Sequence, residues 1–333
     1  LGGPSTISQI RETIKAHHPV FFLFLKQKKK NGFVKSVVRK LNCDDRIAIV
    51  DPVGLSGGLL LFWDSNVNVI QVQKKHFYIV VEFSFDLAPP QWGIFVYFST
   101  YKHHRASQWE EMANDKDLWG DNWFTMGDWN DIRTEEDKMR GIKRSNRSLM
   151  GFNSFINSMD MDELPMTGYQ FTWCNMKSEE GLVEKKLDRA FASFTWNQNF
   201  PNATVSNKVK SSSDHSLLLL DLGYSKHKGN ARFHFDKRWI GREGFKEVVE
   251  EAWSQHSERT PLFKLKEKVK RTKAALLIWS SQIKSKNQHN IDILTKKLEV
   301  LREEKSDNYW VQWNETRNDL NAAHRQEELY WQQ

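Results

Sequence analysis

The spacing of apolar residues changes once along this chain, near Leu222, and this change limits the possible folds more than any other feature. Before Leu222, short apolar and β-branched runs recur between turn residues, which is typical of strands. These runs are Val20–Leu25, Leu59–Trp63, Phe77–Phe85, Trp92–Tyr97 and Trp123–Met126. Apolar residues at helical spacing also occur, in Ser5–His17 and in Ser148–Met159. Residues 1–223 are therefore expected to form one α+β or layered α/β domain.

The last third of the chain has the periodicity of helices. Residues 223–232 are polar and basic and are the expected linker. Beyond about Phe245, apolar residues recur at spacings of three and four, with a polar break at Ser285–Asn290. This pattern predicts two long helices that fold back as a hairpin. We expect residues 224–333 to form a helical extension that packs little against the first domain.

Charge is distributed unevenly between these two regions. The chain has 333 residues and a net charge of +7. Residues 1–223 carry a net charge of +1, and residues 224–333 carry +6. Excess positive charge favours a polyanion such as nucleic acid, because binding releases counterions. A solvated helical face with mixed charges explains the same excess equally well.

Two further features exclude other classes of protein. The longest apolar stretch, near Val20–Leu25, is too short to span a bilayer, so no membrane partner is expected. Cys43 and Cys174 are too few for a disulfide framework, and they fit a reducing compartment. We therefore expect an intracellular protein.

The segment Met126–Asp131 is the strongest chemical signal. An apolar strand ends there in Gly127 and Asp128, and Asn130 follows two residues later. In an extended chain, residues i and i+2 point to the same side, so Asp128 and Asn130 could contact one substrate. The ordinary structural interpretation is an Asx turn after a strand, and for this motif alone it is the better one.

A second signal is the pair Asp214 and His215, which precedes the apolar run Leu217–Leu220. A histidine at the start of a buried strand can polarise a phosphoryl oxygen or protonate a leaving group. Neighbours in an extended chain point to opposite faces, so His215 needs an orienting acid other than Asp214. Asp188, in an otherwise apolar stretch, is the natural candidate. The ordinary alternatives are a surface His that caps a strand and a surface pair of Asp188 with Arg189.

In this order, the motifs resemble the endonuclease/exonuclease/phosphatase superfamily, whose members include abasic-site endonucleases and DNase I-like enzymes. The closer resemblance is to the nuclease domain of plant LINE (non-LTR) retrotransposons, and it spans nearly the whole chain. The segments that carry it are Asp51–Gly58, Phe171–Trp173, Leu187–Ala190, Arg232–Trp239 and Glu327–Trp331. The resemblance implies an α+β fold, a layered α/β/β/α sandwich that is DNase I-like. It also implies a helical extension that leads toward a reverse transcriptase domain.

The resemblance assigns a role to each polar residue of the motifs. Asp128 would position or deprotonate the attacking water, and Asn130 would hold the scissile phosphate. His215 would contact the phosphate and would be oriented by Asp188. Tyr97 would lie beside the phosphate.

The implied metal site departs from the family pattern. A Mg²⁺ ion would offset the charge that builds up on the phosphate, and Asp214 would contribute to the metal region. The family's metal-binding Glu is replaced by Gln27, which offers a carbonyl oxygen without charge. The family's first strand, with a metal-binding Asn, should lie just before Leu1, so an N-terminal truncation is expected. We therefore expect weakened Mg²⁺ binding and little nuclease activity.

DNA is the expected partner, with RNA as a further partner of the basic helical region, and the nucleus is the expected location. Three functions stay open on the sequence. They are a degenerate retrotransposon-derived DNA endonuclease, a non-catalytic nucleic-acid-binding remnant of the same fold, and a phosphomonoesterase of the same superfamily. The retained polar residues favour the first, Gln27 favours the second, and the basic helical tail argues against the third.

Overall fold

The computed structural model of the protein describes most of the chain. The described residues are 4–27, 46–52, 57–85, 89–177, 181–209, 213–223, 235, 239–241, 243–254, 261–282, 286–303 and 308–332. Contacts divide the chain into two compact units. The first comprises Leu1–Tyr224 and Leu294–Gln333, and the second comprises Ser225–Ile293.

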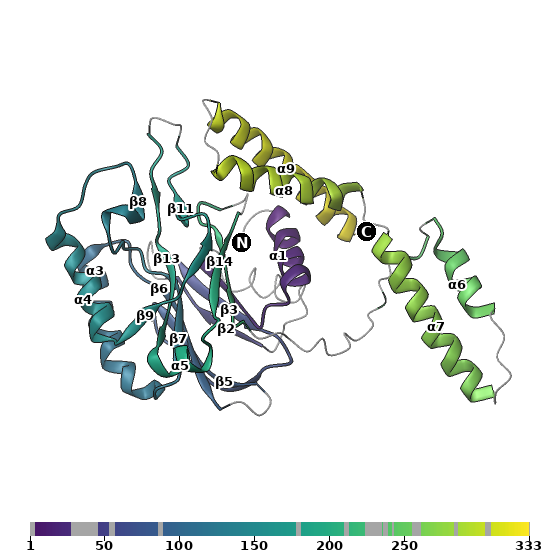
Figure 1. Ribbon diagram of the computed structural model, residues 1–333, viewed down its shortest axis with the longest axis horizontal. Helices are drawn as coiled ribbons and strands as arrows, with labels where there is room; N and C mark the ends of the chain where they lie inside the picture. Colours follow the sequence, from purple (N-terminus) through teal and green to yellow (C-terminus); the bar gives the residue numbers. More distant parts are fainter. Residues whose placement is uncertain are drawn as a thin grey trace. The chain divides into compact units, whose positions relative to one another are not determined.

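The first unit is built around a six-stranded sheet with the strand order β4-β5-β6-β7-β13-β9 (Figure 1). Its strands are β4 (Asn68–Lys74), β5 (Tyr78–Ser84), β6 (Gln91–Tyr97), β7 (Trp123–Asp128), β13 (Asp188–Ser193) and β9 (Met161–Glu163). Strands β6 and β7 are parallel, and the other neighbours are antiparallel. The strands β6, β7 and β13 lie side by side in the middle of this sheet.

Two smaller sheets cover one face of the six-stranded sheet. The first has the order β1-β3-β2, with β1 (Phe21–Gln27), β3 (Gly58–Trp63) and β2 (Ile47–Val50). The second has the order β10-β14-β15, with β10 (Met166–Gly168), β14 (Thr204–Lys208) and β15 (Leu217–Asp221). Leu59 and Leu61 of β3 pack into the core between the sheets, whereas Leu60 and Phe62 face the opposite side. This alternation is the period of two expected for a strand that is buried on both faces.

Helices cover the two outer faces. The helices α3 (Lys102–Asp115) and α4 (Asn146–Ser158) bury Trp109 and Phe152 against the six-stranded sheet (Figure 1). The helix α1 (Pro4–His17) buries Ile10 against Phe22 and Phe24 of β1. The order of layers is therefore α/β/β/α, so the predicted α+β class and DNase I-like sandwich are confirmed.

A third small sheet and three short helices complete the first continuous segment. The sheet has the order β11-β12-β8, with β11 (Trp173–Cys174), β12 (Glu184–Lys185) and β8 (Lys138–Met139). The short helices are η1 (Lys116–Trp119), η2 (Glu135–Asp137) and α5 (Phe194–Asn199). Strand β8 follows the loop that leaves β7, and β12 comes just before Asp188, which lies opposite the end of β7. This sheet therefore lies on the side of the fold where β7 ends.

The C-terminal region is helical, as predicted, but it has more helices than the predicted pair. Its helices are α6 (Phe245–Ser254), α7 (Pro261–Gln282), α8 (Lys286–Glu303) and α9 (Tyr309–Gln332). In the second unit, Trp279 of α7 packs against Phe245 and Trp239. The predicted break at Ser285–Asn290 corresponds to the end of α7, but α8 already begins at Lys286. The expected linker lies outside the described residues from residue 224 onward.

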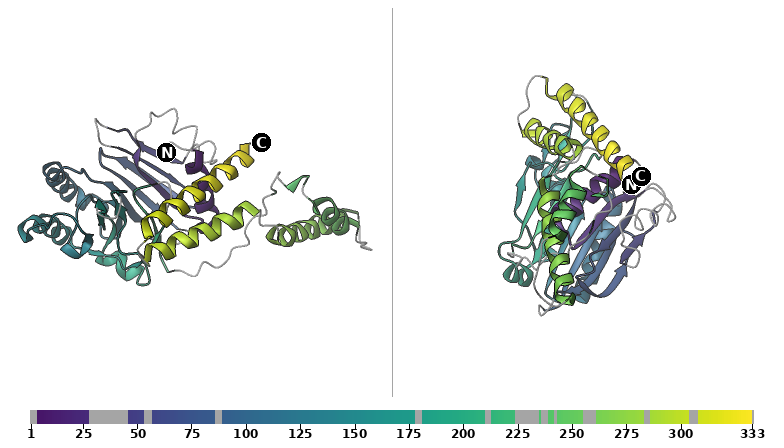
Figure 2. Two further views of the ribbon diagram at one scale, coloured as in Figure 1. Left: turned by 90° about the horizontal axis from the view of Figure 1, so that it is seen from above. Right: turned by 90° about the vertical axis from the view of Figure 1, so that its right-hand side faces the viewer.

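The expectation that the extension packs little against the first domain is wrong for α9. This helix lies along α1 (Figure 2), where His324 Nδ1 is 3.4 Å from Glu12 Oε2. Gln9 Nε2 also donates to Asn321 Oδ1 at 3.5 Å. Sequence periodicity identifies an apolar face but not the surface that covers it, so it could not predict this contact. The described helices include none that is both long and apolar enough to cross a membrane.

Candidate active site

Three neighbouring strands bring polar side chains to one place. Asp128, the last residue of β7, lies directly opposite Asp188, the first residue of β13. Tyr97, the last residue of β6, is paired in register with Asp128 on its other side. Side chains of residues directly opposite each other point to the same face of a sheet. Tyr97, Asp128 and Asp188 therefore share one face of the sheet, at the ends of three neighbouring strands.

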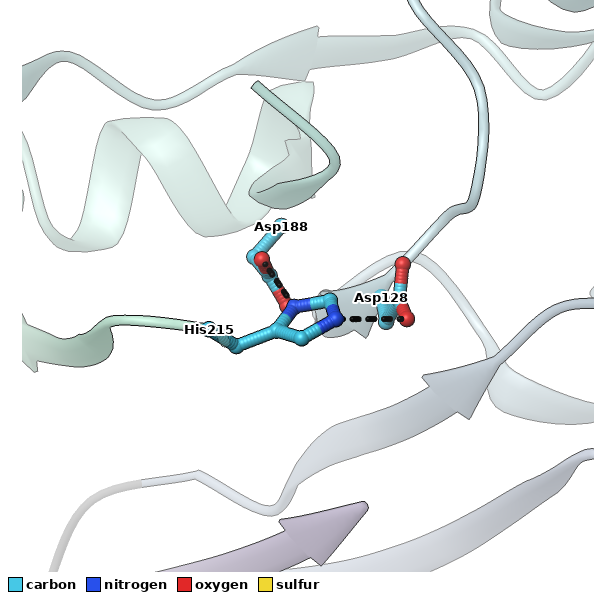
Figure 3. Close-up of side chains that lie close together, drawn as sticks. All are labelled: Asp128, Asp188 and His215. Atoms are coloured by element: carbon cyan, nitrogen blue, oxygen red, sulfur yellow. Dashed lines mark hydrogen bonds and ion pairs between the residues drawn. The ribbon is translucent and has the colours of Figure 1, made fainter. Parts of the chain in front are cut away.

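His215 joins this group from a different sheet. It lies just before β15, and its Nδ1 is 2.8 Å from Asp188 Oδ2 (Figure 3). Its Nε2 is 3.8 Å from Asp128 Oδ2. A carboxylate accepts hydrogen bonds, so Nδ1 carries the hydrogen that Asp188 accepts, and Nε2 faces Asp128. The predicted pairing of His215 with Asp188, and the convergence of both on Asp128, are confirmed.

The pairing of Asp188 with Arg189, the ordinary alternative, is excluded. Arg189 points to the other side of β13, where its Nη1 is 2.6 Å from Glu163 Oε1. Its Nη2 is 2.5 Å from Asp137 Oδ2. Asp188 itself is 5% exposed, so it is not a surface residue.

Asn130 is bound to Asp128 through a turn rather than along a strand. The backbone N–H of Asn130 donates to Asp128 Oδ1 at 2.9 Å, which is the Asx turn of the ordinary interpretation. Its Nδ2 donates to Asp128 Oδ2 at 2.9 Å and to the carbonyl of Phe98 at 2.8 Å. The φ of Asn130 is 49°, a left-handed conformation that Asn tolerates well. The extended-chain argument was therefore wrong, but Asn130 does lie beside Asp128, because the turn itself belongs to the site.

Thr172 links the segments that carry Asp188 and His215 through hydrogen bonds, and sequence reasoning missed this role. Its Oγ1 accepts the backbone N–H groups of Leu187 at 3.0 Å and Asp188 at 2.9 Å. Its carbonyl accepts the N–H of Ser216 at 2.7 Å. The side chain is fully buried. A hydroxyl residue between Phe171 and Trp173 was the available signal, since a buried hydroxyl needs hydrogen-bond partners.

Arg302 of α8 supports the same segments, and nothing in the sequence pointed to it. Its Nη2 donates to the Phe171 carbonyl at 2.6 Å and to Ser216 Oγ at 2.7 Å. Its guanidinium lies 4.4 Å from the centre of the Tyr169 ring. Arg302 is buried and follows Phe171 by 131 residues. Helix α8 therefore contacts the backbone next to Thr172 and the side chain next to His215.

The Tyr97 hydroxyl is set to stay protonated. Burial raises the pKa of Tyr97 to about 12, and the charges of Asp128 and Asp214 add to the effect. The backbone N–H of Gly57 acts in the opposite direction by hydrogen bonding to the oxygen. At neutral pH the hydroxyl is therefore a hydrogen-bond donor beside two carboxylates.

Of the two residues predicted to bind metal, the structure describes the side-chain contacts of Asp214 but not those of Gln27. Asp214 is exposed, and its Oδ2 accepts a hydrogen bond from Trp173 Nε1 at 3.0 Å. Gln27 ends β1 opposite Gly58, but its side chain lies outside the described residues. Asp214 is close enough to Tyr97 for its charge to affect the Tyr97 hydroxyl. Metal binding by Gln27 stays a prediction.

A different group of three could also hold a metal ion. Ligand atoms of Asp128, Asp188 and His215 lie within 4.8 Å of one another. In this arrangement, however, the Nδ1 of His215 is hydrogen bonded to Asp188, and both oxygens of Asp128 accept hydrogen bonds from Asn130. A hard cation such as Mg²⁺ prefers carboxylate, carbonyl and water oxygens. In this arrangement the group is therefore better suited to proton transfer than to binding Mg²⁺.

Comparison with known proteins gives a fold and no family. No family model matches the chain, and no curated protein sequence matches it. The endonuclease domain of TRAS1, a telomere-specific non-LTR retrotransposon, is a solved structure that does match. It has 13% identity and a TM-score of 0.50, and the match covers 68% of this chain and 95% of that domain. At this identity the likeness establishes the endonuclease/exonuclease/phosphatase (DNase I-like) fold alone.

Two further matches have lower TM-scores. The 3′ phosphatase NExo from Neisseria, bound to a product DNA hairpin, has 13% identity and a TM-score of 0.46. That match covers 65% of this chain and 93% of NExo. TDP2 from Caenorhabditis elegans has 13% identity and a TM-score of 0.44, with coverage of 65% of this chain and 68% of TDP2.

Proposed function

We propose that this chain is a metal-dependent phosphodiesterase of the nuclease kind that acts slowly on DNA. The observation that carries the proposal is the contact of His215 with Asp188 on one side and Asp128 on the other. All three are far apart in sequence and largely buried, yet they converge where three strands end. Buried titratable groups that converge in this way at the ends of strands are more typical of an active site than of a structural ion pair.

The site residues divide the chemistry between them. Asp128 holds the attacking water and accepts its proton as the new P–O bond forms. Asp188 accepts the hydrogen on His215 Nδ1 and orients the ring. In its imidazolium form the ring also carries a hydrogen on Nε2, which passes to the leaving oxygen as the old P–O bond breaks, and the ring becomes neutral. Asn130 fixes the Asp128 carboxylate, and the Tyr97 hydroxyl donates a hydrogen bond to a phosphate oxygen.

Mg²⁺ is the proposed cofactor, with Asp214 and the carbonyl oxygen of Gln27 as its protein ligands. Bound Mg²⁺ supplies positive charge against the charge that develops on the phosphate and the leaving oxygen. Such ions often use one or two carboxylates together with substrate phosphates, so a set with Asp214 can suffice. A neutral amide at position 27 attracts a dication less than a carboxylate does, which is why slow turnover is proposed.

The origin that we propose is a non-LTR retrotransposon endonuclease domain, in the plant-type group that the sequence resembles. Work on genomic DNA would place the protein in the nucleus. A downstream reverse transcriptase domain and a contact with RNA belong to the same proposal. The support is the order of the motifs along the chain and the fold that the chain shares with a domain of this kind.

The test is nicking of supercoiled plasmid in the presence of Mg²⁺. We expect slow nicking by the unchanged chain, and EDTA should stop it. Gln27→Glu should raise the rate about 10-fold or more, since an electrostatic contact to the transition state is worth about 10²–10³-fold. In that background, Asp188→Asn should lower the rate about 10²–10⁴-fold, the usual range for loss of acid–base catalysis.

A matched control is Gln198→Glu, the same change of charge at an exposed position of α5. It should leave the rate unchanged. If Gln27→Glu is no faster than the control and Asp188→Asn has no effect, the proposed nuclease is wrong. Hydrolysis of p-nitrophenyl phosphate without nicking of plasmid would instead point to the phosphomonoesterase.

A further inference from the structure

Four side chains form a continuous row that starts at the active site. His215 pairs with Trp173, Trp173 pairs with Lys185, and Lys185 pairs with Lys138, each directly opposite on a neighbouring antiparallel strand. Residues directly opposite each other point to the same face, so all four share one surface. Neighbouring strands lie about 4.8 Å apart, so Lys185 lies about 10 Å along the row from His215.

Lys185 is a cation without a carboxylate partner in the described part of the chain. Its Nζ lies 5.6 Å from the centre of the Trp173 ring. It is half-buried, so its charge is poorly solvated. An unpaired ammonium in such a place costs free energy unless a ligand supplies the opposite charge.

Other cations surround Lys185, and the nearby carboxylates are already occupied. Burial lowers the pKa of Lys185, the charges of Lys138 and Arg144 lower it further, and the charge of Asp131 acts in the opposite direction. Asp131 pairs with Arg144, and Glu135 pairs with Lys138 at 3.1 Å. The positive charge at Lys185 is therefore in excess, and it lies two strands away from His215, the group that faces the scissile phosphate.

We propose that Lys185, seated on the Trp173 ring, binds a phosphate of the DNA strand that flanks the phosphate at His215. The inference rests on the proposed function and adds a substrate subsite to it. A lysine ammonium is a point charge suited to a single phosphate contact. A polynucleotide strand is long enough to reach from His215 to Lys185, whereas a small phosphomonoester held at His215 is too short. The subsite therefore selects polynucleotide substrates.

The test is the affinity for a fluorescein-labelled DNA duplex, measured by fluorescence anisotropy in EDTA so that no turnover occurs. Lys185→Met keeps most of the apolar stem and removes the charge. We expect its Kd to rise about 5-fold to 10-fold at 0.1 M salt, and the slope of log K against log salt to fall by about 1. Lys185→Arg, which keeps the charge, should retain most of the affinity.

Lys74→Met is the matched control, since Lys74 is an exposed lysine on β4 at the far edge of the six-stranded sheet. It should change neither Kd nor slope. The urea midpoint of Lys185→Met should not fall, because the change relieves crowding among like charges. If the urea midpoint of Lys185→Met does fall, the variant Lys185→Gln takes its place in the comparison with Lys74→Met.

Failure of the subsite and failure of the proposed function give different results. Equal Kd and slope for the unchanged chain, Lys185→Met and Lys74→Met overturn the subsite, even where nicking depends on Asp188. Weaker binding by Lys185→Met together with nicking that is indifferent to Asp188→Asn supports the subsite and overturns the catalytic assignment. An unchanged chain that does not bind DNA overturns both.

Discussion

At the scale of single residues, the site depends on groups that satisfy buried backbone amides as much as on the groups that react. Asp188 reaches His215 because its own backbone is fixed by Thr172 Oγ1, which accepts two N–H groups. Buried amides need such partners, since an unsatisfied donor costs about 1–3 kcal/mol. The position of Asp188 therefore depends on one buried hydroxyl in a neighbouring segment as well as on the pairing of β13 with β7.

Replacing Thr172 tests this dependence. Thr172→Val keeps the shape but removes the acceptor for Leu187 and Asp188, so the free energy of unfolding should fall by about 2–4 kcal/mol. Thr172→Ser keeps the oxygen and should cost about 1 kcal/mol, from the lost methyl group. Urea unfolding of the three proteins is the measurement. Equal losses for Val and Ser would contradict the role of the hydroxyl.

At the scale of elements, β13 uses its two sides for different purposes. One side carries Asp188 toward the site, and the other carries Arg189 into a buried ionic network with Glu163 and Lys186. Strand β9, which carries Glu163, is thereby tied to β13 by charge as well as by backbone hydrogen bonds. The alternation of side chains along a strand allows one element to serve both the reactive face and the structural face.

The Glu163 network makes a prediction about pH. Burial alone would raise the pKa of the Glu163 carboxyl, but Arg189 and Lys186 lower it from 4.5 to about 2. A lowered pKa adds stability above pH 4.5, and this stability is lost as the pH falls toward 2. Glu163→Gln should therefore lower the free energy of unfolding by about 3 kcal/mol at pH 7, at 1.36 kcal/mol for each pKa unit.

The measurement is urea unfolding of Glu163→Gln and the unchanged chain between pH 7 and pH 2. The difference should be constant above about pH 5 and should narrow as the pH falls below 4.5. Asp162→Asn, at the exposed neighbouring position, should show a small difference at every pH. A Glu163→Gln difference that stays constant down to pH 2 would argue against a charge-dependent role.

At the scale of the whole molecule, the first compact unit is closed by segments from opposite ends of the chain. Helix α9 packs along α1, and Arg302 of α8 binds the segments that carry Thr172 and His215. The unit thus includes residues 294–333 as part of its fold. A boundary near residue 223 separates the strand-rich segment from the helices in sequence, but it does not separate this unit in space.

Two core substitutions distinguish the units. Leu320 of α9 is 3% exposed, so Leu320→Ala should cost about 2–5 kcal/mol, the usual range for a buried leucine. Because α9 belongs to the first unit, amides of β7 should exchange with solvent faster in this variant. Trp279→Ala, in the second unit, should leave exchange in β7 unchanged. Hydrogen exchange followed by mass spectrometry is the measurement. Unchanged β7 exchange in Leu320→Ala would show that α9 is dispensable for the sheet.

The sequence by itself determined the features that depend on local periodicity and on the order of motifs along the chain. Short apolar and β-branched runs between turn residues predicted the strands, and spacings of three and four predicted the C-terminal helices. The family resemblance paired His215 with Asp188 correctly and placed both with Asp128. These inferences succeed because they depend on patterns within a segment or on residues that a shared fold brings together.

Tertiary structure decided everything that depends on contacts between distant segments. The hydrogen-bond partners of Thr172 and Arg302 follow from which surfaces meet, and no local pattern encodes them. The row from His215 to Lys185 exists only because separate strands pair in one register. The sequence determines which reactive side chains the protein has. Packing and strand pairing across the whole unit determine the distances between them, and these distances create the active site.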